Sequence, residues 1–253
     1  MRTIKCIALA ILFICCIKSY SQKNLSEYKD IEGVFIKSHW GDIKINGTNS
    51  KEEFNITARY TDTSKKPKTI EDLTQYLTFE VVKKKLFIQA RVPQGFESID
   101  LNLNLPKTLF LEIELLRGGN IFASGLKNGV EINSLNGSIK LEQIGKYALV
   151  NAANGEIDAS FSHIDKNYPI SLVTMNGGLK ITLPYNAERD IRLISRKNGY
   201  IVSDFNLDAD KEIINLNVKK YSKQPIINTA KINGGGALLF LSTENGPIEL
   251  NKL

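Results

Sequence analysis

The chain has 253 residues, with 33 basic and 27 acidic side chains and a formal net charge of +6. This length can bury a core as one large domain or two smaller ones. The three cysteines are Cys6, Cys15 and Cys16, so the rest of the chain has neither a disulfide nor a thiolate nucleophile or ligand. The lysines and arginines form no dense face interleaved with aromatic residues, and we therefore expect no nucleic-acid partner.

The N-terminus has the features of a secretory signal peptide. Two basic residues precede an apolar run over residues 6–17, which is shorter than the roughly 20 residues that a membrane-spanning helix needs. Ser19 and Ser21 supply small side chains at the −3 and −1 positions of a cleavage site. We therefore predict that residues 1–21 are a signal peptide. The mature protein would lie in the periplasm, on the outer membrane surface or outside the cell, with no transmembrane segment after cleavage.

Two other interpretations of this end remain open. One is an uncleaved N-terminal anchor. The other is a lipidated Cys15 or Cys16, although a lipidation signal needs a small residue before the cysteine and Cys15 follows Ile14. Signal cleavage would remove three basic residues and no acidic one, so the net charge would fall from +6 to +3.

Residues 22–107 form an N-terminal region in which apolar and polar residues mostly alternate, as in strands with one buried face. The predicted strands include 33–40, 41–47 and 53–61, and two strands within 76–92 that meet at a lysine triplet. The only helix that the pattern favours covers residues 69–77, where Thr69 could cap and three apolar residues fall at helical spacing.

The alternation is clearest on either side of Pro106. Before it, Ile99, Leu101, Leu103 and Leu105 point one way. After it, leucine and isoleucine at 109, 111, 113 and 115 do the same. Proline cannot donate to a strand ladder and restricts the residue before it, so we expect a corner there.

Residues 108–253 are repetitive. Asn-Gly occurs eight times in the chain, starting at Asn46, Asn128, Asn136, Asn154, Asn176, Asn198, Asn233 and Asn245. From Asn136 to Asn198 the dipeptide recurs with a period of about 20 residues, which indicates a repeat architecture. Apolar residues follow Gly137, Gly155, Gly177 and Gly246 at the second and fourth positions, so each of these corners starts a strand with its apolar face inward.

Two architectures fit this pattern. One is an antiparallel meander with Asn-Gly hairpins. The other is a β-solenoid, in which each unit of about 20 residues is a coil stacked on the last and the asparagines and glycines stack with it. One corner is constant while the bends between are variable, and this favours the solenoid. We therefore predict an all-β fold: a β-solenoid, like a single-stranded β-helix, continuous from residue 22 and built from short Asn-Gly-cornered strand repeats over 108–253.

The stretches over residues 115–161 and 236–253 resemble the bacterial putative-adhesin family of β-strand repeats, a group of unknown function. The resemblance rests on strand starts of the form G-[DS]-[IV]-x-[ILV], as at Gly41 and Gly137, and covers roughly residues 30–253. It implies a β-solenoid fold and a place in the cell envelope. The adhesin label implies less, because it rests on architecture and not on a defined ligand.

Residues with catalytic or metal-binding patterns are scarce. The two histidines, His39 and His163, are far apart, so we expect no metal site. We expect His39 and Trp40 to pack at an end of the fold. No nucleophile elbow is present, and the glycine-rich residues 232–239 lead into a strand rather than a phosphate-binding helix. We therefore predict no catalytic, cofactor-binding or metal-binding residues and no cofactor.

The alternative function is that of a carbohydrate-active β-helix enzyme, and it rests on carboxylates that face outward. Glu156 and Asp158 are predicted to face outward, and Glu131 and Glu142 to lie on neighbouring coils, where a pair could act as acid and base. Lys140 and Lys180 occupy corresponding outward positions, so cross-strand charge pairing explains Asp158 equally well.

The sequence therefore predicts a non-enzymatic, exported β-solenoid protein of a bacterial cell envelope. It would present a binding or scaffolding surface to an envelope protein or a glycan. A third interpretation is a structural protein that associates with itself through an end coil, because an uncapped solenoid exposes strand edges.

Overall fold

A computed structural model describes residues 22–59, 73–91, 98–208 and 223–253. The predicted signal peptide, residues 1–21, lies outside the described residues. The described part is all-β, as predicted, and its only helical element is the 3-10 helix η1 (Leu73–Tyr76). The α-helix expected over 69–77 is therefore wrong for residues 73–77, since η1 is a single tight turn and Leu77 already begins a strand. Residues 69–72 lie outside the described part.

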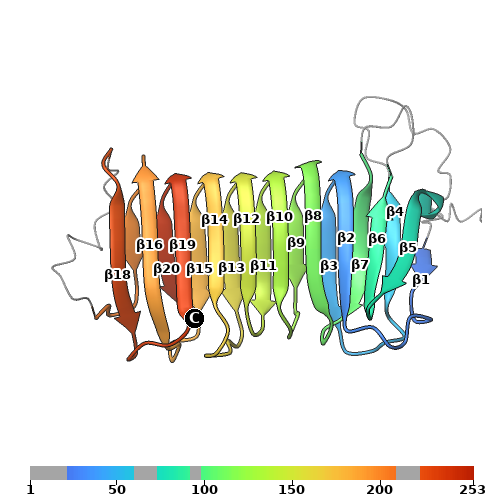
Figure 1. The fold of residues 1–253 in the computed structure, drawn as a ribbon, viewed down its shortest axis with the longest axis horizontal. Helices are drawn as coiled ribbons and strands as arrows, with labels where there is room; N and C mark the ends of the chain where they lie inside the picture. Colours follow the sequence, from blue (N-terminus) through green and yellow to red (C-terminus); the bar gives the residue numbers. More distant parts are fainter. Residues whose placement is uncertain (1–21, 60–72, 92–97, 209–222) are drawn as a thin grey trace, which may run out of the picture.

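The strands form two ten-stranded sheets, which we call sheet A and sheet B. Sheet A has the order β1 (Gln22–Asn24), β4 (Asn55–Arg59), β7 (Asp100–Pro106), β3 (Ile43–Thr48), β9 (Ile121–Ser124), β11 (Ile139–Ile144), β13 (Ile157–Phe161), β15 (Leu179–Leu183), β20 (Ile248–Lys252), β17 (Ile201–Ser203). Sheet B has the order β18 (Ile226–Ile232), β16 (Arg189–Lys197), β19 (Leu238–Asn245), β14 (Ile170–Asn176), β12 (Ala148–Asn154), β10 (Val130–Asn136), β8 (Phe110–Gly118), β2 (Gly33–Trp40), β6 (Lys85–Ala90), β5 (Leu77–Val82). Figure 1 shows the strands crossing an elongated molecule.

From β8 to β15 the chain alternates between the sheets, and we call a sheet B strand with the sheet A strand that follows it one coil. Strands of successive coils pair in parallel, so that Ile139 lies opposite Ile157, and Ile157 opposite Leu179. The repeat interval seen in the sequence is therefore the distance along the chain between hydrogen-bonded neighbours.

The order of coils departs from the order of the chain at both ends. The last coil, β19 and β20, inserts between the coil of β14 and β15 and that of β16 and β17. Asn176 therefore neighbours Asn245 rather than Asn198. The first coil, β2 and β3, likewise inserts beside β8 and β9. Beyond these coils, antiparallel strands complete the sheets: β5 pairs with β6, β18 with β16, and β4 with β7.

The core lies between the sheets and consists of rows of leucine and isoleucine. In each central strand every second side chain is buried, for example Ile139 and Leu141 in β11 and Ile170 and Leu172 in β14. Because strands stack in register, most buried side chains pack on an apolar one from the next coil, and the core cluster runs from Leu25 to Leu250.

The corner that leads from sheet B to sheet A is a column of stacked glycines. A Cβ atom added to Gly137, Gly155, Gly177 or Gly246 would lie 2.0–2.1 Å from the carbonyl oxygen of the glycine on the adjacent coil. Their φ angles lie between +112° and +153°, a region that only glycine enters at low cost. Glycine at this corner is therefore required by both backbone shape and coil spacing.

The asparagines before these glycines form a ladder of side-chain amides. Asn154 donates to Asn136 at 2.8 Å, Asn176 to Asn154 at 2.7 Å, and Asn245 to Asn176 at 2.8 Å. Only Asn198 at this corner has a positive φ of its own. The asparagines thus stabilise the stacking of coils through side chains, more than they shape the turn.

Candidate functional site: the outer faces and the basic corner

The outer face of sheet A carries alternating charges. Asp158 lies in register between Lys140 and Lys180, and Lys180 lies opposite Glu249 on the next strand. The Lys140 ammonium also lies 2.6 Å from Glu142. This hydrogen bond, the charge of Glu142 and the charge of Asp158 raise the pKa of Lys140. The arrangement matches cross-strand charge pairing.

The predicted proximity of Glu131 and Glu142 is wrong, because Glu131 lies on β10 in sheet B and Glu142 on β11 in sheet A. Consecutive strands of one coil belong to different sheets, so their outward side chains face opposite sides of the molecule. The in-register neighbour of Glu131 is Glu112. Glu112 accepts from Lys85 at 2.6 Å, and Glu131 accepts from the Tyr147 hydroxyl at 3.2 Å.

An aromatic stack lies beside these carboxylates. The Tyr147 ring centre is 6.5 Å from that of Phe110 and 5.4 Å from that of Tyr168. The Lys85 ammonium lies 5.3 Å from the Phe110 ring centre, and the Lys146 ammonium 4.3 Å from that of Tyr168. Burial, then the charge of Glu131 and the hydrogen bond to it, raise the pKa of Tyr147 to about 12. The rings therefore stabilise one another and two lysines.

The two histidines are not brought together. His39 is the penultimate residue of β2 and His163 lies in the turn after β13, and both are exposed. Trp40 beside His39 is 49% exposed, so the expected packing of this pair is only partial. Within the described residues, no three side chains of His, Cys, Asp or Glu gather as metal ligands. In the same residues no helix has the length and apolar character to cross a membrane.

The turns that lead from sheet A to sheet B hold one lysine per coil, and we call this row the basic corner: Lys107, Lys127, Lys146 and Lys166. Backbone hydrogen bonds join the turns. Lys127 N–H donates to the Lys107 carbonyl at 2.8 Å, Gly145 N–H to that of Leu126 at 2.6 Å, and Asp165 N–H to that of Lys146 at 3.1 Å. In Figure 1 these turns form the lower edge of the molecule.

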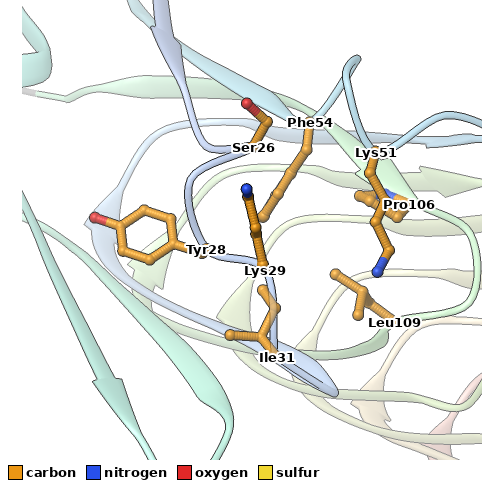
Figure 2. Close-up of a pocket in the computed structure, with 8 residues that line it drawn as sticks. All are labelled: Ser26, Tyr28, Lys29, Ile31, Lys51, Phe54, Pro106 and Leu109. Carbon is orange, nitrogen blue, oxygen red and sulfur yellow. The ribbon is translucent and has the colours of Figure 1, made fainter.

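A small pocket lies at the N-terminal end of the basic corner (Figure 2). Lys29 and Lys51 line it together with a mostly apolar set: Ser26, Tyr28, Ile31, Phe54, Pro106 and Leu109. Pro106 and Leu109 flank Lys107 in sequence, so the pocket continues the row of lysines toward the start of the fold.

Arg189, at the start of β16, anchors the longest turn of this row. Its side chain is fully buried and donates to the carbonyl oxygens of Asp165 at 2.8 Å and Tyr168 at 3.0 Å. Burial lowers the pKa of its guanidinium, while the charge of Asp165 opposes that shift. Arg189 therefore fixes the turn that carries Lys166.

Sequence reasoning missed the basic corner, although a signal was present. The four lysines recur with a period of about 20 residues, the same period as the Asn-Gly corners. A search for dense clusters of lysine could not find this row, because its members are far apart in sequence and become neighbours only when the coils stack.

Comparisons with known proteins support the fold. No family model and no curated protein matches the chain. The structure is similar to a crystal structure of a putative cell adhesion protein from Clostridium sporogenes, with a TM-score of 0.52 and 15% identity over 92% of this chain and 98% of that one. A putative adhesin from Bacteroides fragilis is matched with a TM-score of 0.39 and 8% identity over 92% and 95% of the two chains. The family resemblance suggested by the sequence thus has a structural neighbour named a putative cell adhesion protein, at a TM-score of 0.52, but no family model behind it.

Proposed function

We propose that the chain is an exported β-solenoid protein of a bacterial cell envelope, which binds or scaffolds a partner through its outer surface and catalyses no reaction. The observation that carries this proposal is the parallel register of the coils, in which Asn136, Asn154 and Asn176 are direct neighbours. Such a register turns single outward side chains into long rows, and extended concave or flat surfaces of this kind are what repeat proteins use for binding.

Two further observations agree with a binding role. The outward carboxylates Glu112, Glu131 and Glu142 are each held by a lysine or a tyrosine hydroxyl. The structural neighbour with the TM-score of 0.52 is named a putative cell adhesion protein. Its name supports an adhesin-like role at the cell surface, with an envelope protein or a glycan as partner.

The test is a glycan array combined with a pull-down from envelope extracts, using residues 22–253. Retention of a defined glycan or envelope protein supports the proposal. Retention of nothing by either method, with a folded protein, would overturn it.

A carbohydrate-active enzyme is the second candidate, and the neighbouring Glu112 and Glu131 beside the aromatic stack favour it. Release of sugar fragments from any retained glycan, abolished by Glu131→Gln, would establish it instead. Self-association through an end of the solenoid is the third, and sedimentation of the protein over a range of concentrations tests it directly.

A further inference from the structure

We propose that the basic corner binds an extended anionic polysaccharide that carries one carboxylate on each sugar. The inference rests on the proposed binding function and names its partner class. It starts from a contrast between the lysines that are paired with carboxylates and the row of lysines in the turns.

Several lysines on and beside the faces are paired with carboxylates. The distances are 2.8 Å for Lys37 to Glu114, 2.6 Å for Lys85 to Glu112 and 2.6 Å for Lys140 to Glu142. Lys84, in the turn before β6, is paired with Glu32 at 2.7 Å in the same way. These ammonium groups have a protein partner and need no other.

The four lysines of the basic corner form no salt bridge with any carboxylate of the described residues. Lys107 donates instead to the neutral amide of Asn49, and Lys146 to that of Asn128 at 3.4 Å. Burial and the neighbouring charge of Lys127 lower the pKa of Lys107. The row thus carries no salt bridge within the described residues and the like charges of Lys107 and Lys127 repel, and a bound polyanion relieves that repulsion.

The spacing of the row selects an extended partner. Neighbouring strands lie about 4.8 Å apart, and the turns follow that spacing because backbone hydrogen bonds link them. A small anion can contact one or two ammonium groups. A linear chain with a charge on each sugar can contact all four at once, and each contact after the first is intramolecular. Arg189 keeps the turn of Lys166 in place for the last of these contacts.

The aromatic rings beside the row argue against single-stranded nucleic acid, the other common extended polyanion. Base stacking needs ring faces open to solvent. Tyr147 lies between Phe110 and Tyr168, and lysine ammonium groups lie over Phe110 and Tyr168. Sugars need no such platform, since their hydroxyls can bond to exposed amides in the same turns, such as Asn167.

The experiment compares two variants of the purified protein that lose the same number of charges. The corner variant replaces the four lysines of the row with glutamine: Lys107→Gln, Lys127→Gln, Lys146→Gln and Lys166→Gln. The control variant replaces the four lysines that are paired with carboxylates: Lys37→Gln, Lys84→Gln, Lys85→Gln and Lys140→Gln. Melting temperatures verify folding, and the double variant Lys127→Gln/Lys166→Gln, whose side chains are exposed, serves if the corner variant does not fold.

The probe is polygalacturonate, titrated by calorimetry at two salt concentrations, with dextran, an oligothymidylate and phosphatidylglycerol vesicles as further arms. We expect the corner variant to weaken polygalacturonate binding by about tenfold or more and to flatten its salt dependence. The control variant should change it less than about twofold. Dextran should not bind.

Equal losses in both variants would overturn the inference, because net charge alone would then explain binding. So would no binding of polygalacturonate, or tighter binding of the oligonucleotide or the vesicles. Its failure is distinguishable from that of the proposed function. If the corner variant retains the same partners as the wild type in the envelope pull-down, the surface function stands and only the assignment to the basic corner falls.

Discussion

Replacing Gly177 with alanine would place a methyl group 2.1 Å from the carbonyl oxygen of Gly155 on the preceding coil. Ordinary contact begins at 3.4 Å, so the two coils would have to separate by about 1.3 Å to restore it. That movement lengthens two hydrogen bonds. Gly155 N–H donates to the Asn176 carbonyl at 2.8 Å, and the Asn176 side-chain amide donates to that of Asn154 at 2.7 Å. Two weakened hydrogen bonds cost about 1–3 kcal/mol, and an alanine in this backbone region costs about 1–3 kcal/mol more.

We therefore expect Gly177→Ala to destabilise the protein by about 2–6 kcal/mol, which lowers the melting temperature by about 5–20 °C in a chain of this size. Gly178→Ala is the matched control, since its Cβ would meet Pro247 at an ordinary 3.4 Å and its φ is not in the positive region. Urea unfolding followed by circular dichroism measures both. If the two variants melt within a degree or two of each other, glycine stacking is not what holds this corner.

Three further predictions concern stability. Thr243→Val should cost about 1–2 kcal/mol in urea unfolding, because the buried Thr243 hydroxyl donates to the Gly177 carbonyl at 2.9 Å; Thr243→Ser, which keeps the hydroxyl, should cost less. Lys83→Asn should raise the melting temperature by a few degrees, since Lys83 has a φ of 48° in the turn before β6 and asparagine tolerates that region better; no rise would mean that the turn is unstrained. The pKa of Tyr147 is near 10 in the unfolded chain and about 12 in the folded one, so its stabilising contribution is complete below pH 10 and is lost as pH rises toward 12. The melting temperature should therefore fall more between pH 9 and pH 11 in the wild type than in Tyr147→Phe, and equal falls would contradict the assigned role of Tyr147.

Strand positions and buried faces are predictable because they depend on local alternation. The strand expected at residues 33–40 has the bounds that the structure shows, and Leu101, Leu103 and Leu105 are buried as expected. The stacking of Asn136, Asn154 and Asn176 follows from their regular spacing. These features need only the local pattern and the period with which it recurs.

The order of coils could not be predicted, because it depends on which strand best covers an exposed edge. Asn198 follows Asn176 at the regular interval of the repeat, yet β19 and β20 take the place beside β14 and β15. The C-terminal coil buries Leu239, Leu241 and two residues of β20, whereas β17 has only three residues and ends at Ser203. The longer apolar pair completes the core better, and the insertion appears in the sequence only as a long gap.

The candidate site escaped sequence reasoning for a related reason. Lysine is common on any soluble surface, and Lys107, Lys127 and Lys146 are each ordinary within their own turns. What distinguishes them is that successive turns all lack a carboxylate partner among the described residues, while Lys37, Lys85 and Lys140 on the sheet faces are paired with Glu114, Glu112 and Glu142. That difference appears only when the neighbours of each side chain in the adjacent coils are known. In a fold whose coils repeat, a row of like charges is therefore recognised as a candidate site by its periodicity together with the pairing that it lacks.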